Sequence, residues 1–347
     1  MPPLSILILS DERPGHYHLA EGVAVAIARQ TPVDVLRLPI SRRWAAPGRF
    51  LASALTFGLP AISILRSGYW LDGDLPSMAD LVISAGGDTL AANVAAARHY
   101  NAANIFCGTL RHLAPHHFSL VISSYARHAS LPRHLVALKP SGLDPDSLPR
   151  AMDDRARMPG APPRVAGLLV GGPSGLFRWR DDEWQRLAAF PDESHRAHGI
   201  RWIVSTSRRT PDAVADLFAD IARRPDGPIA EFIDFRVAGP GTLPRLFAGV
   251  DAVLATEDSS TMLSEAVCAR LPVVGVSPIE HDFKDEEREY RALLTTEGWC
   301  RGLPLSGLSP ASFLAALSEV RPLAENHLDR LAAALAERLP ELFRERS

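Results

Sequence analysis

The stretch Asp251-Ala-Val-Leu-Ala-Thr-Glu-Asp-Ser-Ser-Thr-Met-Leu-Ser-Glu265 passes from an apolar run to small hydroxyl residues and then to a helical pattern. A continuous apolar run such as Ala252–Thr256 is typical of a strand buried on both faces of a parallel sheet. Asp and Ser, which follow it, are residue types that begin helices. The stretch therefore predicts one strand–loop–helix unit of an α/β fold.

The same order of strand, loop and helix recurs on both sides of this stretch. Before it, the expected strands are Leu4–Leu9, Val33–Leu38, Asp80–Ser84, Asn104–Gly108, Leu120–Ser124, Arg164–Val170, Arg201–Ser205 and Glu231–Phe235, and after it Pro272–Val276. Strands separated by helices form right-handed βαβ units and an open, doubly wound sheet. A stretch rich in Pro, Asp and Arg, Lys139–Pro163, interrupts the series and reads as a linker.

The fold class expected from this pattern is α/β, with two Rossmann-like, doubly wound parallel-sheet domains facing a cleft. We expect the first domain at residues 1–150 and the second at 164–320, with an amphipathic helix within 321–345 that packs back on the first. A length of 347 residues agrees with two domains. In such sheets, ligands bind beyond the carboxyl ends of the strands, so the loops after the strands are the candidate sites.

The composition excludes several classes of protein. A net charge of −3 does not suit non-specific nucleic-acid binding, which needs a basic surface. The three cysteines are odd in number and far apart, so they predict no disulfide framework and no zinc site. The N-terminus lacks the basic region and cleavage site of a signal peptide. We therefore expect a cytoplasmic protein without a bound metal or cofactor.

One apolar segment, Phe50–Leu65, has two interpretations. Arginine and tryptophan flank it, as in segments that lie in a membrane interface. Alternatively, it is a buried helix that is broken at Gly58-Leu-Pro60. The first interpretation predicts a peripheral contact with the inner face of the plasma membrane.

The loop of the opening stretch is the main candidate for a donor site. The first turn of a helix has unpaired N–H groups and a partial positive charge, so a diphosphate can bind there beside the hydroxyls of Ser259 and Ser260. Glu265, about one turn further on, can accept hydrogen bonds from ribose hydroxyls. The alternative is ordinary capping of the helix by Asp258 or Ser259, which does not account for the whole run of polar residues. The donor-binding set also includes Glu257, Asp258 and Met262.

Two further loops of the second half follow strands in the same way. Ser205-Thr-Ser-Arg-Arg-Thr-Pro211 carries Ser207, Arg208, Arg209 and Thr210, and the two arginines can neutralise a diphosphate leaving group. Alternatively, they are solvated side chains at a helix start, where a positive charge is slightly unfavourable. Gly171 and Gly172 allow close approach of a ligand to the backbone, although many strand-to-helix turns are rich in glycine.

In the first half, the loop Asp11-Glu-Arg-Pro-Gly-His16 follows the first strand and carries Gly15. His16 can act as a general base toward an acceptor hydroxyl, and Asp11 can orient it or replace it. Alternatively, the histidine only makes hydrogen bonds within the loop. A second loop, Gly86-Gly87-Asp88, contains either a rival base or a helix cap in Asp88. The chain has no GxSxG, HExxH or P-loop pattern.

Together, these loops resemble the ELM1-like family, whose members are named both as mitochondrial fission proteins and as glycosyltransferases of the B-type fold. The segments that carry the resemblance are Asp11–His16, Ser84–Asn93, Val170–Ser174, Ser205–Pro211 and Thr256–Ala266. The resemblance implies a second domain that binds a nucleotide-sugar, with Glu265 at the ribose and Ser259 and Ser260 at the diphosphate. It also implies metal-independent transfer and an acceptor site at His16. The segment Ser123–Arg127 departs from the family's pattern.

Three functions agree with the sequence. The first is a glycosyltransferase that moves a sugar from a nucleoside diphosphate to a hydroxyl acceptor, lipid-linked or part of the cell envelope, by inverting displacement. The second is a non-catalytic protein that keeps the fold and binds a membrane surface or a partner. The third is a nucleotide-sugar 2-epimerase. Binding of a nucleoside diphosphate separates the first and third from the second, and the need for an acceptor separates the first from the third.

Overall fold

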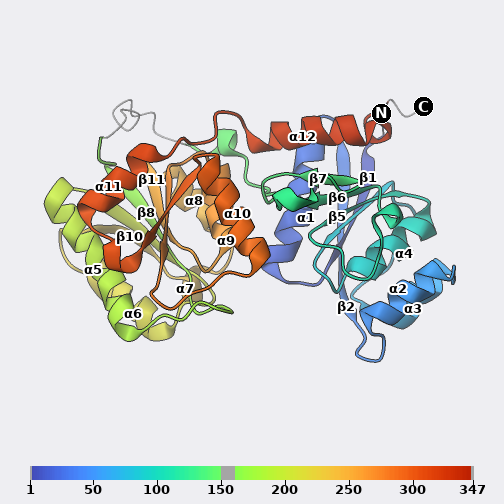
Figure 1. Cartoon of the computed structure of the whole chain (residues 1–347), viewed down its shortest axis with the longest axis horizontal. Coiled ribbons are helices and arrows are strands. Elements are labelled where there is room, and N and C mark those ends of the chain that lie inside the picture. Colours follow the sequence, from blue (N-terminus) through green and yellow to red (C-terminus); the bar gives the residue numbers. More distant parts are fainter. Residues whose placement is uncertain (1, 150–160, 345–347) are drawn as a thin grey trace. The chain divides into compact units, whose positions relative to one another are not determined.

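The computed structural model describes residues 2–149 and 161–344, and the chain divides into two compact units (Figure 1). Unit 1 comprises Met1–Gly142 and His327–Ser347, and unit 2 comprises Leu143–Asn326. Unit 2 thus begins earlier than the expected 164 and extends beyond 320. Residues 150–160 of the expected linker lie outside the described residues.

Unit 1 is built on a seven-stranded sheet in the order β3-β2-β1-β4-β5-β6-β7. All neighbouring strands are parallel except β2 and β3. The strands are β1 (Leu4–Ser10), β2 (Val33–Arg42), β3 (Tyr69–Leu71), β4 (Leu81–Ala85), β5 (Ala103–Cys107), β6 (Leu120–Ser123) and β7 (His134–Val136). The continuous apolar runs are buried, as expected: every residue of β4 and β6 is buried.

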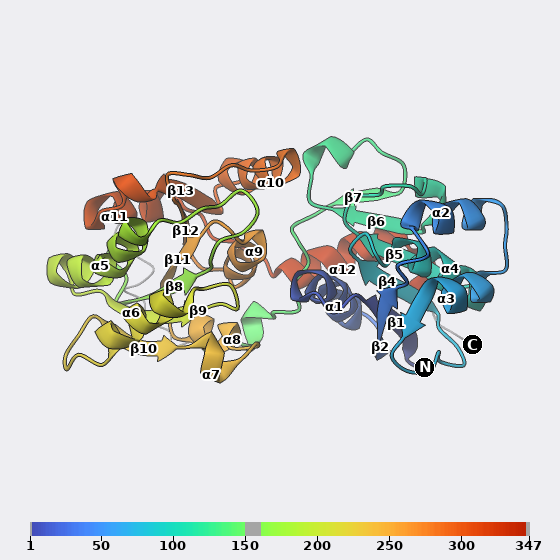
Figure 2. The ribbon, with the colours of Figure 1, turned by 90° about the horizontal axis from the view of Figure 1, so that it is seen from below.

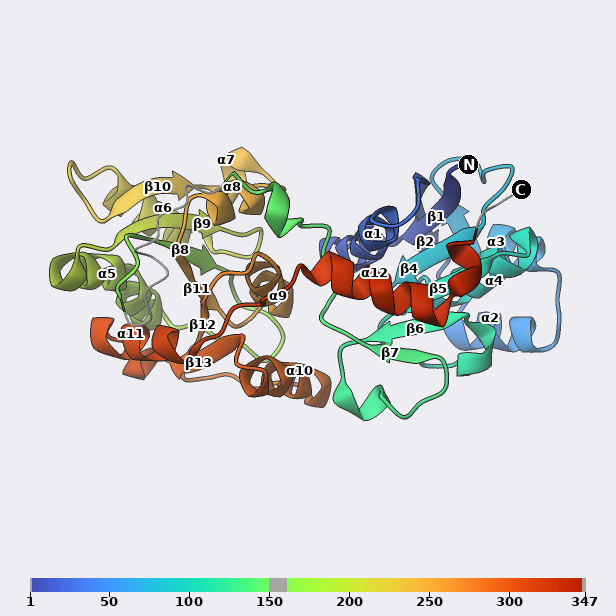
Figure 3. The same cartoon turned by 90° about the horizontal axis from the view of Figure 1, so that it is seen from above.

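Helices cover both faces of this sheet because alternate strand residues face opposite sides. One face packs on α2 (Gly48–Thr56), α3 (Ala61–Gly68) and α4 (Leu90–Tyr100) through residues such as Leu7 and Leu9. The other face packs on α1 (Pro14–Ala28) and α12 (His327–Arg338) through Ile6 and Ile8. Figure 3 shows α12 beside α1, so the end of the chain completes the core of unit 1. Short 3-10 helices are η1 (Pro115–His117), η2 (Ala126–His128) and η6 (Pro340–Leu342).

Unit 2 is built on six parallel strands in the order β10-β9-β8-β11-β12-β13. They are β8 (Val165–Val170), β9 (Arg201–Thr206), β10 (Ile229–Ile233), β11 (Ala252–Thr256), β12 (Val273–Ser277) and β13 (Cys300–Pro304). This is the order of a dinucleotide-binding Rossmann sheet. The expectation of two doubly wound parallel sheets is confirmed.

The helices of unit 2 also lie on both faces of its sheet (Figure 2). On one face, α5 (Asp181–His198), α6 (Asp212–Ala222) and α11 (Pro310–Glu319) form a core rich in aromatic residues with Trp202. On the other lie α8 (Leu243–Ala248), α9 (Ser260–Cys268) and α10 (Asp285–Thr296). The remaining short helices are α7 (Phe235–Ala238), η3 (Pro145–Ser147) and η5 (Leu305–Gly307).

The apolar segment Phe50–Leu65 forms α2 and α3, with the break at Gly58–Pro60 that one interpretation predicted. Its inner side chains, including Leu51, Leu55 and Ile64, are part of the unit 1 core. Its outer side chains, including Phe50 and Phe57, are exposed. The segment is therefore neither fully buried nor fully exposed. In the described part of the chain, no helix has the length and apolar character that crossing a membrane requires.

Candidate functional site

The strand order reverses once in each sheet, between β1 and β4 in unit 1 and between β8 and β11 in unit 2. At such a point the two neighbouring loops diverge, and ligands of open α/β sheets bind in the crevice that remains. The loops after β1 and β4 contain His16 and Asp88. The loops after β8 and β11 contain Gly171, Gly172 and Ser259. Four of the five candidate loops predicted from the sequence therefore follow strands at a switch point, and the fifth, Ser205–Pro211, follows the neighbouring strand β9.

His16 and Asp11 form a hydrogen-bonded pair in unit 1. The distance from His16 Nδ1 to Asp11 Oδ2 is 2.8 Å, and the Asp11 side chain is 7% exposed, whereas His16 is 32% exposed. A buried carboxylate that holds Nδ1 orients the imidazole and directs its other nitrogen, Nε2, away from the pair. The geometry is that of an oriented imidazole on a partly exposed side chain, which a general base requires.

The local backbone explains how this pair is held. The sequence placed Pro14-Gly-His16 in a loop, but these residues form the first turn of α1, which begins at Pro14. Proline suits that position because its fixed φ is already helical and its missing N–H would be unpaired there. Gly15 is exposed in this turn. Gly86 lies opposite, with a φ of +91°, and a Cβ on it would lie 2.3 Å from His16 Nδ1, so glycine is needed to make room for the imidazole.

Asp88 does not cap α4, which was one of the two roles that the sequence suggested. The N-cap of α4 is Thr89, and its hydroxyl donates to the carbonyl groups of Ala85 and Gly86. The Asp88 carboxylate pairs instead with Arg42, at 3.1 Å, and with Arg13, at 3.5 Å. Both arginines are therefore held by this carboxylate. The role of a capping residue is therefore corrected to that of an ion-pair partner.

In unit 2, α9 begins where the sequence placed the donor-binding helix. Ser259 is the N-cap, and its hydroxyl accepts the amide of Met262 at 3.4 Å. Ser260 and Met262 are half-buried in the first turn, and Glu265 is half-buried one turn later. Capping uses one hydroxyl of the run, as the alternative predicted. The N-terminus of α9 carries the partial positive charge of a helix start, which suits an anion.

The glycines after β8 make room for protein atoms. A Cβ on Gly171 would lie 2.2 Å from Asp258 Oδ2, and one on Gly172 would lie 1.9 Å from the carbonyl oxygen of Arg209. The amide of Gly172 donates to Asp258 Oδ2 at 3.2 Å, and the amide of Gly171 donates to the Thr256 hydroxyl at 2.7 Å. Atoms of the neighbouring loops thus fill the space beside these glycines that was predicted to admit a ligand.

Asp258 joins three loops of unit 2. Its side chain is fully buried, and Oδ2 lies 2.6 Å from a guanidinium nitrogen of Arg209. Burial raises the pKa of Asp258 above its usual value, against the opposing influence of the Thr256 hydroxyl and the Arg209 charge. Arg209 is therefore not one of two solvated arginines, which was the alternative interpretation, because Asp258 holds it. Arg208 is exposed, and among the described residues it has no ion-pair partner.

The hydroxyl residues after β9 also stabilise the loops. Thr210 is buried, and its hydroxyl lies 2.8 Å from the carbonyl oxygen of Val170 and 2.7 Å from that of Gly171. Ser207 accepts the amide of Arg209 at 3.2 Å, and Ser205 is buried at the end of β9. These contacts fix the loop so that Arg208 projects from a well-defined backbone.

Glu257, which the sequence assigned to donor binding, has its side chain enclosed against the strands of the unit 2 sheet. Ser277 donates to its Oε2 at 2.7 Å, and Arg291 Nε lies 3.9 Å away. A Cβ on Gly275 would lie 2.3 Å from Glu257 Oε1. The carboxylate is therefore enclosed between β12 and β13, and it contributes to the framework of the site.

Several residues near the two sites were missed by sequence reasoning. In unit 1 these are Arg13, Arg42, Tyr69 and Arg111, and in unit 2 they are Ser277 and Arg291. Arg111 could have been found, because it follows the strand at Asn104–Gly108 and so lies at the same sheet edge as the other loops. Within residues 2–149 and 161–344, no group of three or more His, Cys, Asp or Glu side chains is placed to hold a metal ion.

Comparison with models of known protein families identifies the family of this chain. The family model described as mitochondrial fission ELM1 matches residues 14–339. The chain belongs to this family. A search of curated proteins finds no match.

Several solved structures have similar folds at low sequence identity. MurG of Acinetobacter baumannii has a TM-score of 0.50 at 14% identity, covering 97% of this chain and 100% of that one. A protein of Listeria monocytogenes named as a UDP-N-acetylglucosamine 2-epimerase has a TM-score of 0.52 at 11% identity, covering 100% and 99%. The co-structure of S. aureus MnaA with UDP has a TM-score of 0.53 at 10% identity, covering 99% of each chain. This ELM1 family member thus has a glycosyltransferase-B-like α/β fold.

Proposed function

We propose that the protein binds a nucleoside-diphosphate sugar through unit 2 and transfers the sugar to a hydroxyl acceptor bound by unit 1. The observation that carries this proposal is the His16–Asp11 pair, with 2.8 Å between Nδ1 and Oδ2 at the switch point of the first sheet. A binding protein has no need of a partly exposed imidazole oriented by a buried carboxylate. A transferase needs such a base beside its acceptor.

In the proposed reaction, the acceptor oxygen attacks the anomeric carbon of the sugar. Its bond to that carbon forms as the bond from the carbon to the diphosphate oxygen breaks, and the acceptor proton passes to His16 Nε2. Asp11 stabilises the imidazolium that results. The step is a single displacement, so the configuration at the anomeric carbon inverts, and no metal ion takes part.

Unit 2 supplies the groups for the donor. The first turn of α9 directs backbone amides and the hydroxyls of Ser259 and Ser260 toward the position assigned to the diphosphate. Arg208 adds an exposed positive charge that stabilises the departing nucleoside diphosphate. Glu265, one turn later, accepts the ribose hydroxyls. Structural relatives named for UDP and UDP-N-acetylglucosamine support these as the first ligands to try.

The test is a panel of nucleotide-sugars incubated with candidate hydroxyl acceptors, with release of the nucleoside diphosphate as the readout. A transferase releases nucleotide only when an acceptor is present, and His16→Ala abolishes most of that release. A 2-epimerase changes the sugar at C2 with no acceptor present. Absence of both activities, together with absence of nucleotide binding, would leave only the non-catalytic function.

A second candidate function, binding to a membrane surface, is favoured by the outer side of α2 and α3. Trp44 is 92% exposed and Phe57 is 85% exposed, and Phe50, Leu59 and Trp70 are exposed on the same region of unit 1. Between Asp34 and Asp72 the chain has five arginines and no acidic residue. Aromatic side chains beside arginines suit the interface of an anionic bilayer. We propose that this surface brings the protein to the inner face of the plasma membrane.

Sedimentation with vesicles tests this second function. The wild type should sediment with vesicles that contain phosphatidylglycerol and should remain in solution with phosphatidylcholine alone. Replacing both Trp44 and Phe57 with Ser should abolish sedimentation. The matched control is Val237→Ser, which removes an equally exposed apolar side chain from unit 2. Equal sedimentation of the double variant and the wild type would contradict the proposal.

A further inference from the structure

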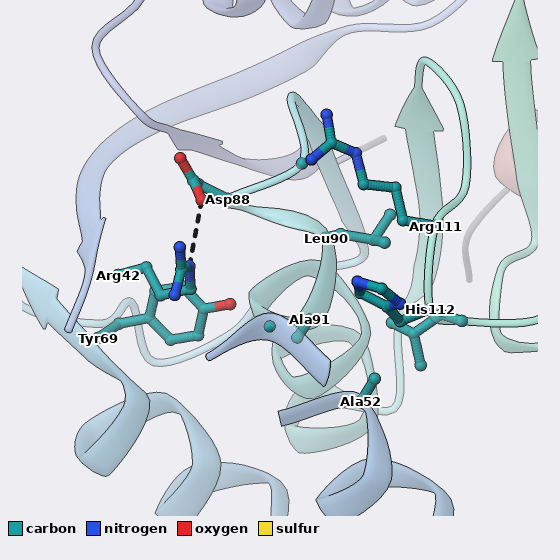
Figure 4. Close-up of a pocket in the computed structure, with 11 residues that line it drawn as sticks. Arg42, Ala52, Tyr69, Asp88, Leu90, Ala91, Arg111 and His112 are labelled. Atoms are coloured by element: carbon teal, nitrogen blue, oxygen red, sulfur yellow. Dashed lines mark hydrogen bonds and ion pairs between the residues drawn. The ribbon is translucent and has the colours of Figure 1, made fainter. Parts of the chain in front are cut away.

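Unit 1 contains a cavity of about 120 Å³ beside the His16 loop, between β2, β3, α2 and the start of α4 (Figure 4). Its polar lining is made by Arg42, Tyr69, Asp88, Arg111 and His112. None of these side chains belongs to the His16–Asp11 pair or to the donor loops of unit 2.

The hydroxyl of Tyr69 indicates that the cavity holds a polar group. Tyr69 is 1% exposed, and its hydroxyl makes no hydrogen bond of ordinary geometry with the described residues. The backbone of Ala92, in the first turn of α4, is near enough to act on this hydroxyl, and it lowers the pKa of Tyr69 against the larger effect of burial. Figure 4 shows this hydroxyl pointing into the space between the labelled side chains. A buried hydroxyl without a partner is costly, and native structures rarely keep one unless a ligand or water satisfies it. Burial raises the pKa of Tyr69, so the hydroxyl keeps its proton and can donate it in a hydrogen bond.

The other groups around the cavity are also mainly donors. Arg42 and Arg111 present guanidinium groups, which donate and never accept. The Asp88 carboxylate is already engaged by Arg42 and Arg13. Gly87 allows the Arg111 side chain to lie against the backbone, since a Cβ there would be 3.1 Å from Arg111 Cζ.

The start of α4 adds to this positive environment. Leu90 and Ala91, its first two residues, line the cavity. The amides of a first helical turn lack acceptors within the helix and carry partial positive charge. With the guanidinium groups and the Tyr69 hydroxyl, they form a set of donors that suits an anion with several acceptor oxygens.

We propose that this cavity of unit 1 is a phosphate-binding site, formed by Tyr69, Arg42, Arg111 and the first turn of α4. Its size agrees, because an empty cavity of roughly 150 Å³ accepts a molecule such as benzene, and a phosphate group is smaller. The phosphate comes either from a lipid headgroup or from a soluble phosphate ester. Assignment of that phosphate to the acceptor rests on the proposed function, whereas the anion site itself does not.

The experiment measures binding of inorganic phosphate to the full chain by calorimetry, with melting temperature as a second readout. Tyr69→Phe removes only the hydroxyl, and Arg111→Gln removes an exposed charge. Each should weaken phosphate binding about tenfold, the effect of losing one hydrogen bond to a charged group. Without phosphate, Tyr69→Phe should melt at the wild-type temperature or above, because the lost hydroxyl had no partner. The matched control is Tyr100→Phe, whose hydroxyl donates to the Pro76 carbonyl at 2.8 Å, and it should bind phosphate normally.

A second arm separates the two sources of phosphate. Vesicles of phosphatidylcholine with and without phosphatidic acid are sedimented with the wild type and with Tyr69→Phe, in the presence and absence of free phosphate. Binding that needs phosphatidic acid, depends on Tyr69 and is displaced by free phosphate assigns a lipid headgroup. Binding of free phosphate alone assigns a soluble ester.

The proposal is overturned if Tyr69→Phe and Arg111→Gln bind phosphate as the wild type does. It is also overturned if the wild type binds neither phosphate nor phosphatidic acid vesicles in a way that depends on Tyr69. UDP binding is measured on the same variants. If the wild type does not bind UDP, the proposed function of unit 2 is contradicted. The result for phosphate binding to unit 1 does not depend on that outcome.

Discussion

The two switch points have the same topology and different chemistry. In unit 1 a buried carboxylate, Asp11, holds a histidine whose side chain is partly exposed. In unit 2 a buried carboxylate, Asp258, holds Arg209 and the amide of Gly172, so its partners are turned inward. The first arrangement makes a reactive side chain available. The second joins three loops and leaves helix amides, hydroxyls and Arg208 as the groups that can meet a ligand. We infer that unit 1 carries the proton chemistry and that unit 2 carries the recognition of the donor.

The largest effect is expected at the reactive pair. His16→Ala should lower kcat about 10²- to 10⁴-fold, because a positioned general base contributes that much. UDP affinity should be unchanged, since the donor is assigned to unit 2. The control is His116→Ala, which removes an exposed imidazole from another loop. A His16→Ala variant with the wild-type kcat would contradict the assignment of the proton chemistry to unit 1.

The next effect concerns the packing of the unit 2 loops. Gly172→Ala should lower the free energy of unfolding by about 3 kcal/mol, because the new Cβ meets the carbonyl oxygen of Arg209 and the backbone must shift. The control is Gly175→Ala, which has a φ of +58° and open space around it. It should cost only about 1 kcal/mol of left-handed strain. Urea unfolding measures both, and an equal loss in the two variants would contradict the close contact.

A smaller effect is expected at the Asp258–Arg209 pair. Arg209→Ala should lower the free energy of unfolding by about 2 kcal/mol, less than for a fully buried pair because Arg209 is 31% exposed. The variant leaves a buried carboxylate without its cation. The double variant that also changes Asp258 to Ala should recover part of the loss in a double-mutant cycle.

The same pair predicts a pH dependence. Burial raises the pKa of Asp258, so the folded chain takes up this proton more readily than the unfolded chain. The stability from this group is therefore complete below its usual pKa and is lost as pH rises through the higher folded value. Without Arg209 the folded pKa rises further, so the deficit of Arg209→Ala should shrink as pH is lowered from 7 toward 4. A deficit that grows on acidification would contradict this assignment.

The smallest effect concerns the three cysteines. Cys107, Cys268 and Cys300 are buried, and burial raises the pKa of Cys107 and of Cys300 to about 12. The thiolate is the reactive form, so a thiol reagent at pH 8 should label none of them in the folded protein and all three in urea. Rapid labelling without denaturant would mean that one of the sheets opens readily.

The strands that are buried on both faces of the sheets could be predicted from the sequence. Runs such as Leu4–Leu9 and Ala252–Thr256 are apolar throughout, which is how a central parallel strand is recognised. Short edge strands lack that pattern, and β3, β7 and β13 were therefore missed. β13 contains Arg301 and Gly302 in only five residues, and β3 and β7 have three residues each.

The candidate sites were predicted less completely, for a physical reason. His16 and Asp11 lie five residues apart, so the sequence itself suggested their pairing. Asp258 and Gly172 are 86 residues apart and meet only because β8 and β11 are neighbours. A glycine that makes room for a distant carboxylate looks in the sequence like one that makes room for a ligand.

The most direct test of the account is the effect of UDP on the melting temperature of the wild type and of Glu265→Ala. If the start of α9 binds the diphosphate and Glu265 binds the ribose, UDP raises the melting temperature of the wild type and gives little or no rise in the variant. Testing UDP, GDP and dTDP side by side keeps the outcome independent of the base. The account is contradicted if no nucleoside diphosphate stabilises the wild type, or if Glu265→Ala responds equally.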